Sequence, residues 1–173
     1  MAFSWYSRLA PAARAVYRAS DRIHTVALPD PAPLQPCAVA LQAALAHGDA
    51  ARVGLHCQRL ADGITGQLAV VPVQTRVLSA RPHDARGELH GLYEPADRRR
   101  RARISVWMRT AQQRRVVAYR TFLRTLLHEL CHHLDYEYLG LDDSFHTEGF
   151  YRRESALLRQ LVLVPAQQEL SLA

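Results

Sequence analysis

Lysine and asparagine are absent from this chain of 173 residues, and all 22 of its basic residues are arginine. Because alanine, leucine and proline are also abundant, we interpret part of this arginine as a bias toward GC-rich codons. The net charge of +6 therefore argues only weakly for a nucleic-acid partner. The one dense basic run is Arg98, Arg99, Arg100 and Arg101. We expect it to be a solvated hairpin tip, with weak DNA association as the alternative.

Cysteine is scarce, and long apolar runs are missing. The cysteines Cys37, Cys57 and Cys131 are odd in number and widely spaced, which argues against a disulfide framework and a cysteine-ligated zinc site. No stretch approaches the roughly 20 apolar residues of a membrane span. The N-terminal residues also lack the apolar core of a secretory signal. We expect a cytoplasmic protein without membrane contact, and we expect it to be a monomer.

Length and an apolar fraction of 49% predict a single α+β domain. Residues 1–36 are expected to hold an N-terminal helix and a proline-rich linker, and residues 37–173 the main body of the domain. Gly63 and Gly66 are expected to close its first helical region. The hydrophobic periodicity predicts helices over 5–20, 37–47, 50–60 and 116–139, and three short strands over 73–78, 87–93 and 103–108.

The most informative motif is His-Glu-x-x-His, formed by His128, Glu129 and His132. Residues four apart share one face of a helix, so the two imidazoles can bind one metal ion. The glutamate stands beside the metal, where it can take a proton from a metal-bound water. The motif therefore predicts a Zn²⁺ site with Glu129 as its catalytic base.

The segment around the motif has the pattern of a two-sided helix. It lacks glycine and proline, and its apolar stripe consists of Val116, Leu123, Leu127, Leu130 and Leu134. His128 and His132 fall on another side, with Thr121, Thr125 and Asp135. His133 points about 100° away from His132 and is not expected to be a ligand. Cys131 is expected to be a small buried side chain.

A hydrolytic zinc site needs three protein ligands and an open position for water. The metzincin continuation is excluded, because Asp135 and Tyr138 occupy its glycine and histidine positions. We favour His146, which follows His132 after a turn at Gly140 and precedes a second helix with Ser144 as its expected N-cap. Glu148, Glu154 and Asp135 remain as alternative ligands.

These residues resemble the SprT-like family of zinc metallopeptidases, within the gluzincin-like zincins. That family has His-Glu-x-x-His, then a histidine thirteen to fifteen residues later, then phenylalanine four residues after that. His146 and Phe150 stand in those places, and the resemblance covers about residues 65–155. It implies a zincin-like catalytic domain in which His128, His132 and His146 bind zinc and Glu129 is the general base.

The resemblance also implies where a substrate would lie. We expect the strand over 103–108 to be an edge strand beside the cleft that holds an extended peptide, with Trp107 as a cleft-wall candidate beside the more ordinary reading of a packing tryptophan. Asp135 is a candidate for orienting a ligand imidazole. Tyr151, Arg109 and Arg152 are weak candidates for stabilising the oxyanion.

The function expected from the sequence is therefore hydrolysis of a protein or peptide by a zinc metallopeptidase. One alternative is a protease that acts on DNA-bound proteins, which the arginine run and the positive net charge allow. The other is a non-catalytic zincin-like domain that binds zinc or a partner. Glu129 argues against the second alternative, because a purely structural zinc site has no use for a base.

Overall fold

The computed structural model describes residues 6–84 and 87–162, and it has the α+β composition that the sequence predicts. Two short 3₁₀ turns, η1 (Tyr6–Arg8) and η2 (Ala32–Leu34), accompany the main elements. The helices are α1 (Pro11–Arg22), α2 (Gln35–Ala46), α3 (Ala50–Gln67), α4 (Tyr119–Glu137) and α5 (Glu148–Leu161). The strands are β1 (Gln74–Ala80), β2 (His83–Asp84), β3 (Gly87–Glu88), β4 (Gly91–Glu94) and β5 (Arg103–Arg109).

Strand β5 lies in the centre of the main sheet, so the prediction that it is the edge strand was wrong. The strand order is β1-β5-β4, with β5 parallel to β1 and antiparallel to β4. All its interior residues are buried, including Trp107, which is a packing side chain and not part of the cleft wall. The sequence pattern did not predict this order because β5 pairs in parallel with a strand that is distant along the chain. The edge strands of this sheet are β1 and β4.

The predicted strand over 87–93 is interrupted. Gly87–Glu88 pairs with β2 in a separate two-stranded sheet, whereas Gly91–Glu94 pairs with β5. The β4–β5 connection carries the arginine run, and Arg98 to Arg101 are all exposed there, as expected for a hairpin tip.

Helix α3 is longer than predicted, and it continues through both glycines that were expected to close it. Its start agrees with the sequence: Gly48 has a φ of +66°, and the Asp49 side chain caps the helix by accepting from the N–H of Arg52. Gly63 lies within the helix under Leu34, whose Cδ2 would be 2.3 Å from a Cβ at that position, so the close packing leaves no room for a side chain there. Tertiary packing therefore overrides the low helix propensity of glycine here.

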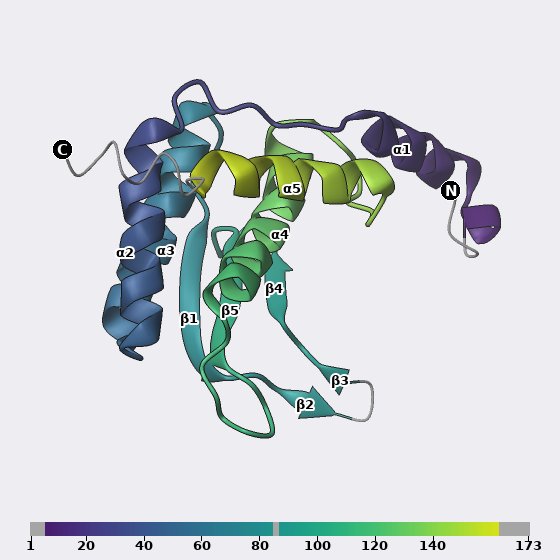
Figure 1. The fold of residues 1–173 in the computed structure, drawn as a ribbon. Coiled ribbons are helices and arrows are strands. Elements are labelled where there is room, and N and C mark those ends of the chain that lie inside the picture. The colour runs from purple at the N-terminus through teal and green to yellow at the C-terminus, as the bar shows by residue number, and fades with distance from the viewer. Residues whose placement is uncertain (1–5, 85–86, 163–173) are drawn as a thin grey trace.

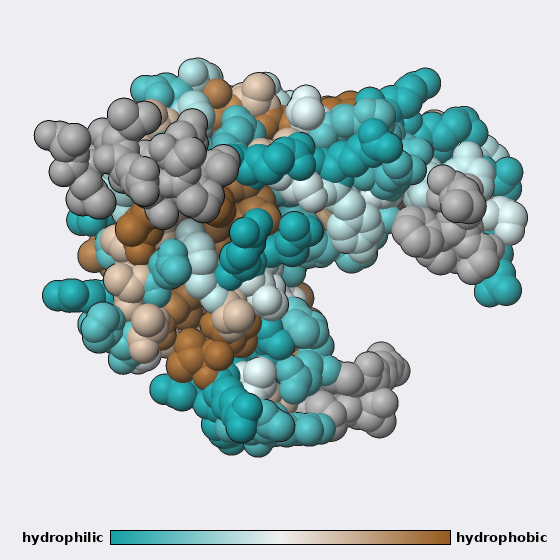
Figure 2. Space-filling model, viewed as in Figure 1, coloured by the Kyte–Doolittle hydropathy of each residue, from teal (hydrophilic) through white to brown (hydrophobic). Residues whose placement is uncertain are grey.

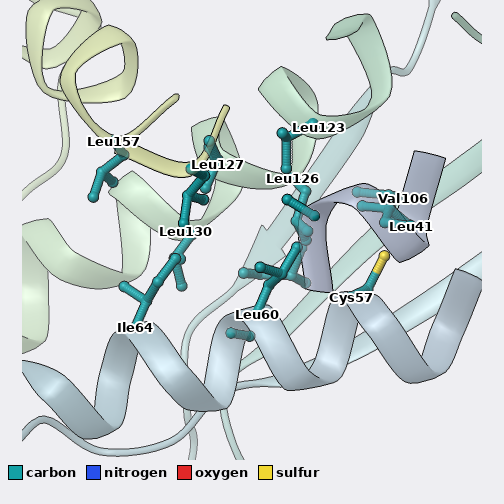
Figure 3. Close-up of a cluster of buried hydrophobic side chains, with 14 of the residues drawn as sticks. Leu41, Cys57, Leu60, Ile64, Val106, Leu123, Leu126, Leu127, Leu130 and Leu157 are labelled. Atoms are coloured by element: carbon teal, nitrogen blue, oxygen red, sulfur yellow. The ribbon is translucent and has the colours of Figure 1, made fainter. Parts of the chain in front are cut away.

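The hydrophobic core lies between α2, α3, α4, α5 and the sheet (Figure 3). The leucines of the predicted stripe form its centre, because Leu123, Leu127, Leu130 and Leu134 are each at most 1% exposed. Val116, which was predicted to begin this helix, lies before α4 in an isolated bridge to Arg109. Cys131 is also buried, and all three cysteines are free. With its apolar stripe fixed in the core, α4 must turn its opposite side toward β4 and the surface.

The elements form an open arrangement in which α5 and α1 extend along one end of the molecule and the β2–β3 hairpin along the other (Figure 1). The space-filling view is notched between these two ends, and its surface there is largely hydrophilic (Figure 2). Within the described residues, none of the helices has the length and apolar character needed to cross a membrane.

Candidate metal centre

Three histidine side chains converge where α4 faces the loop before α5. His128 and His132 lie one turn apart on α4, with ring centroids 5.1 Å apart. The Nε2 atom of His146 lies 3.0 Å from the Nε2 atom of each of them. These three residues are the one group in the described part of the chain whose donor atoms could hold a metal ion.

The sequence alternatives for the third position have other partners. Glu148 is exposed and pairs with Arg152. Asp135 is buried and accepts hydrogen bonds from Ser144 and Arg153. Glu154 accepts from the outer nitrogen of His128 and so stands behind that ring.

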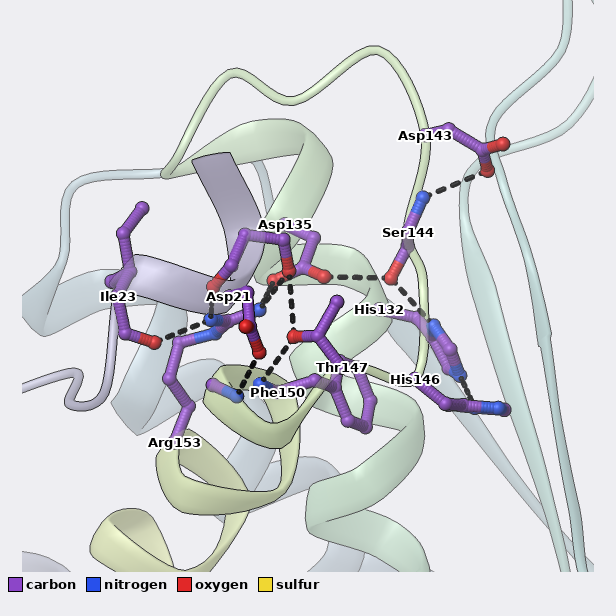
Figure 4. Close-up of polar contacts among 12 residues, drawn as sticks. Asp21, Ile23, His132, Asp135, Asp143, Ser144, His146, Thr147, Phe150 and Arg153 are labelled. Carbon is purple, nitrogen blue, oxygen red and sulfur yellow. Dashed lines mark hydrogen bonds and ion pairs between the residues drawn. The ribbon is translucent and has the colours of Figure 1, made fainter. Parts of the chain in front are cut away.

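The outer nitrogens of two rings are held by oxygen atoms. His128 Nδ1 lies 2.9 Å from Glu154 Oε2, and His132 Nδ1 lies 2.7 Å from Ser144 Oγ. The Ser144 hydroxyl donates to Asp135 Oδ2, so it must accept from His132. Both rings therefore carry their proton on Nδ1 and direct the Nε2 lone pair toward the cluster (Figure 4 shows the His132 side).

The environment favours the neutral form of two of these histidines, His132 and His146. Burial, and then the charges of His128 and His146, lower the pKa of His132 to about 3. Burial and the charge of His128 also lower the pKa of His146, against the opposite effect of Glu154. Neutral imidazole is the form that binds a metal ion.

This donor set fits zinc. Three imidazole nitrogens that face one point, with free space on the remaining side, correspond to the three-ligand arrangement of hydrolytic zinc sites. The Nε2 separations of 3.0 Å would widen by a few tenths of an ångström around an ion with Zn–N bonds of about 2.0–2.1 Å.

Glu129 lies between α4 and the edge strand β4. Its side chain is 7% exposed, and burial raises its pKa to about 7, although His128 and the backbone N–H of Tyr93 favour the charged form. At Gly91, a Cβ atom would be 2.4 Å from Glu129 Oε1. The backbone of β4 and the carboxylate are therefore in direct contact, and only glycine at position 91 leaves the carboxylate where it is.

A cleft of about 670 Å³ opens over the three histidines and Glu129. One wall is the segment from Glu88 to Tyr93, which includes the exposed side chains of Leu89 and Leu92. The other wall is α4, from Thr121 to Tyr136, together with Ser144 and His146. The edge strand that borders this cleft is thus β4, in place of the strand that the sequence suggested.

Several sequence predictions concern the surroundings of the cluster. Thr147, and not Ser144, caps α5 by accepting from the N–H of Phe150, because Ser144 is used by His132 and Asp135. His133 is buried and contacts Tyr93 and the carbonyl oxygen of Val71, away from the other histidines. Asp135 does act on a ligand candidate, but through Ser144.

The three residues considered for oxyanion stabilisation are differently placed. Tyr151 lies near the cluster, with its ring centroid 5.9 Å from that of His146, but it does not line the cleft. Arg109 donates to the carbonyl oxygen of Arg114, and Arg152 pairs with Glu148.

The sequence did not predict a role for Gly91, Tyr93 or Arg153, because their roles depend on long-range contacts that no local sequence pattern encodes.

No family model, curated protein or solved structure matches this chain.

Proposed function

We propose that this protein is a zinc-dependent metallopeptidase of the SprT-like, zincin type. The observation that carries this proposal is the convergence of three Nε2 atoms, from His128, His132 and His146, beside a buried glutamate in an open cleft. A structural zinc site would instead be closed by a fourth protein ligand. The proposed substrate is a protein or peptide, and the proposed compartment is the cytoplasm.

In this proposal, zinc held by the three histidines would supply a water of pKa about 7 and would polarise the substrate carbonyl. Glu129 would accept the proton of the attacking water as the oxygen of that water bonds to the carbonyl carbon of the peptide. Glu129 then donates the proton to the leaving nitrogen as the C–N bond breaks. Glu154 and Ser144 hold the two α4 imidazoles in the tautomer that binds metal.

The edge strand β4 supports a peptide as the substrate. It is bonded to β5 along one side and borders the cleft beside Glu129 along the other. An extended peptide can lie along such an edge and bond to its backbone. Leu89 and Leu92 offer apolar contacts to substrate side chains in the same wall.

The decisive experiment compares the wild type with Glu129→Gln, on unfolded protein substrates, after the bound metal has been measured. We expect about one zinc per chain in both proteins, and a loss of cleavage of about 10²–10⁴-fold in the variant. Glu137→Gln is the matched control, because Glu137 is exposed on the same helix outside the cleft. Cleavage by Glu129→Gln at the wild-type rate would refute the mechanism, and zinc binding without any cleavage would favour a non-catalytic zinc protein.

A second candidate function is proteolysis of DNA-bound proteins. It is favoured by the exposed arginine loop that follows β4, the strand beside the cleft. Only part of its charge is neutralised, since Arg100 pairs with Asp97 and Arg103 with Glu94. This function requires DNA binding that weakens steeply with salt and is lost when Arg98, Arg99 and Arg101 are replaced by glutamine. Absence of measurable binding at moderate salt would dismiss it.

A further inference from the structure

Helix α1, which the sequence suggested was separated from the main body by a linker, contacts the chain on both sides of His146. The buried side chain of Tyr17 lies against Phe145, with ring centroids 6.0 Å apart. The Ser20 hydroxyl lies 3.3 Å from the hydroxyl of Thr147, and both residues are fully buried. The two neighbours of His146 in the chain are thus fixed by one helix.

The same end of α1 reaches His132 through a chain of polar side chains (Figure 4). Arg153, which is 0% exposed, donates to the carbonyl oxygens of Ser20 and Ile23 at 2.7 and 2.6 Å. Its other terminal nitrogen donates to Asp135 Oδ1 at 2.8 Å. Asp135 Oδ2 accepts from Ser144, and Ser144 accepts from His132.

The buried guanidinium of Arg153 needs several hydrogen-bond acceptors, because an unpaired charge in the interior costs several kcal/mol. The carbonyl groups of Ser20, in the last turn of α1, and of Ile23, its C-cap residue, supply two of them. The position of Arg153, and hence of Asp135, therefore depends on where α1 lies.

Gly149 determines how closely α1 can approach α5. Its N–H donates to Asp21 Oδ1 at 3.1 Å. A Cβ atom at this position would be 2.5 Å from the carbonyl oxygens of both Ser20 and Asp21. Backbone atoms cannot yield as a flexible side chain can, so any larger residue must displace the end of α1.

We propose that α1 is a positioning element of the metal centre, which holds His146 through Phe145 and Thr147, and His132 through Arg153, Asp135 and Ser144. This inference rests on the proposed metal centre but not on the proposed peptidase reaction. It makes the affinity for the metal dependent on a helix that contributes no ligand.

The test is Gly149→Ala, which displaces α1 without altering any residue of the cluster. We expect zinc affinity, measured by competition with a chelator, to fall by about 10–100-fold, the usual effect of losing outer support of a metal ligand. We also expect the visible spectrum of the cobalt-substituted protein to change. Gly66→Ala is the matched control, because it lies in a helix and a Cβ there meets no heavy atom within 4 Å.

A purely structural role for α1 predicts something else: a lower melting temperature of the metal-free protein, with unchanged zinc affinity and cobalt spectrum at temperatures where the protein is folded. That result would overturn the inference. If Gly149→Ala does not fold, Ser20→Ala decides, because it removes the α1 hydroxyl that contacts both Thr147 and Arg153 and leaves the loop residues unchanged. Zinc affinity should fall in Ser20→Ala, and unchanged affinity in that variant would also overturn the inference.

These measurements separate the inference from the proposed function. A wild type that binds zinc tightly but cleaves nothing would refute the peptidase, while the comparison of zinc affinities still decides the role of α1. A wild type that binds no zinc would refute both.

Discussion

The two halves of the candidate metal centre are built in different ways. His128 and His132 belong to α4, and the helical repeat alone brings their rings together. His146 belongs to a loop, and it is brought to them by contacts such as that of Ser20 with Thr147, which are 127 positions apart. A helix that is packed in the core presents two ligands through its own repeat. A ligand on a loop depends on contacts between the loop and other elements of the fold.

The difference also concerns exposure. His128 and His132 are partly buried, whereas His146 is exposed on the cleft side although its neighbour Thr147 is fully buried. The third ligand candidate is therefore fixed through its backbone neighbours, and its ring lies against Phe150 and Tyr151 of α5. We infer that the α4 half provides the rigid geometry and the loop half completes it.

The largest expected effect comes from removing the loop half of the centre. In His146→Ala, we expect zinc affinity to fall by more than about 10³-fold, beyond the 10–100-fold that is typical of residues that only support a ligand. The melting temperature of the metal-free protein should change little, because the side chain is exposed. Zinc affinity by competitive titration and melting by circular dichroism check both points. Affinity within tenfold of the wild type would show that the two α4 histidines suffice or that an acidic residue replaces His146.

A smaller effect is expected from the support of the α4 half. The Glu154 carboxylate, 3% exposed, accepts from both His128 and Arg124. In Glu154→Gln, only one amide oxygen remains to accept, so we expect zinc affinity to fall by about 10–100-fold. Arg124→Gln is the matched control, because the arginine side chain is 51% exposed and its loss leaves the bond to His128 in place. Equal effects of the two substitutions would contradict this assignment, and the same titration measures both.

The sequence could predict the α4 half because its geometry is local. The spacing of His128 and His132, the apolar stripe of Leu123 and Leu127, and the absence of glycine and proline all follow from one helical repeat. His146 was selected by its distance along the chain and by a family resemblance, and the structure does bring it to the other two histidines.

The supports of the centre could not be predicted, for a physical reason. Arg153 reads as a surface arginine in a charged stretch until α1 covers it, and Gly149 reads as a turn residue until the backbone of Asp21 lies against it. The same holds for β4: its position at the sheet edge depends on a parallel pairing between β1 and β5 that no alternation of residues reveals. Long-range contacts decide each of these cases.

The last prediction concerns the place where the base on α4 meets this edge strand. In Gly91→Ala, the new Cβ would lie within 2.8 Å of three atoms of the Glu129 side chain. Because that side chain is flexible, we expect the carboxylate to move aside and the fold to survive, with cleavage reduced by about tenfold and zinc affinity unchanged. The variant is checked by measuring kcat and by titrating zinc. Gly54→Ala is the control, because a Cβ atom at position 54 would meet no heavy atom within 4 Å.

A fall in zinc affinity equal to the fall in kcat would mean that β4 positions the metal ligands as well as the base. An unchanged kcat would mean that the contact between β4 and Glu129 has no part in the reaction. If Glu129 is the general base, moving its carboxylate away from the attacking water should lower kcat.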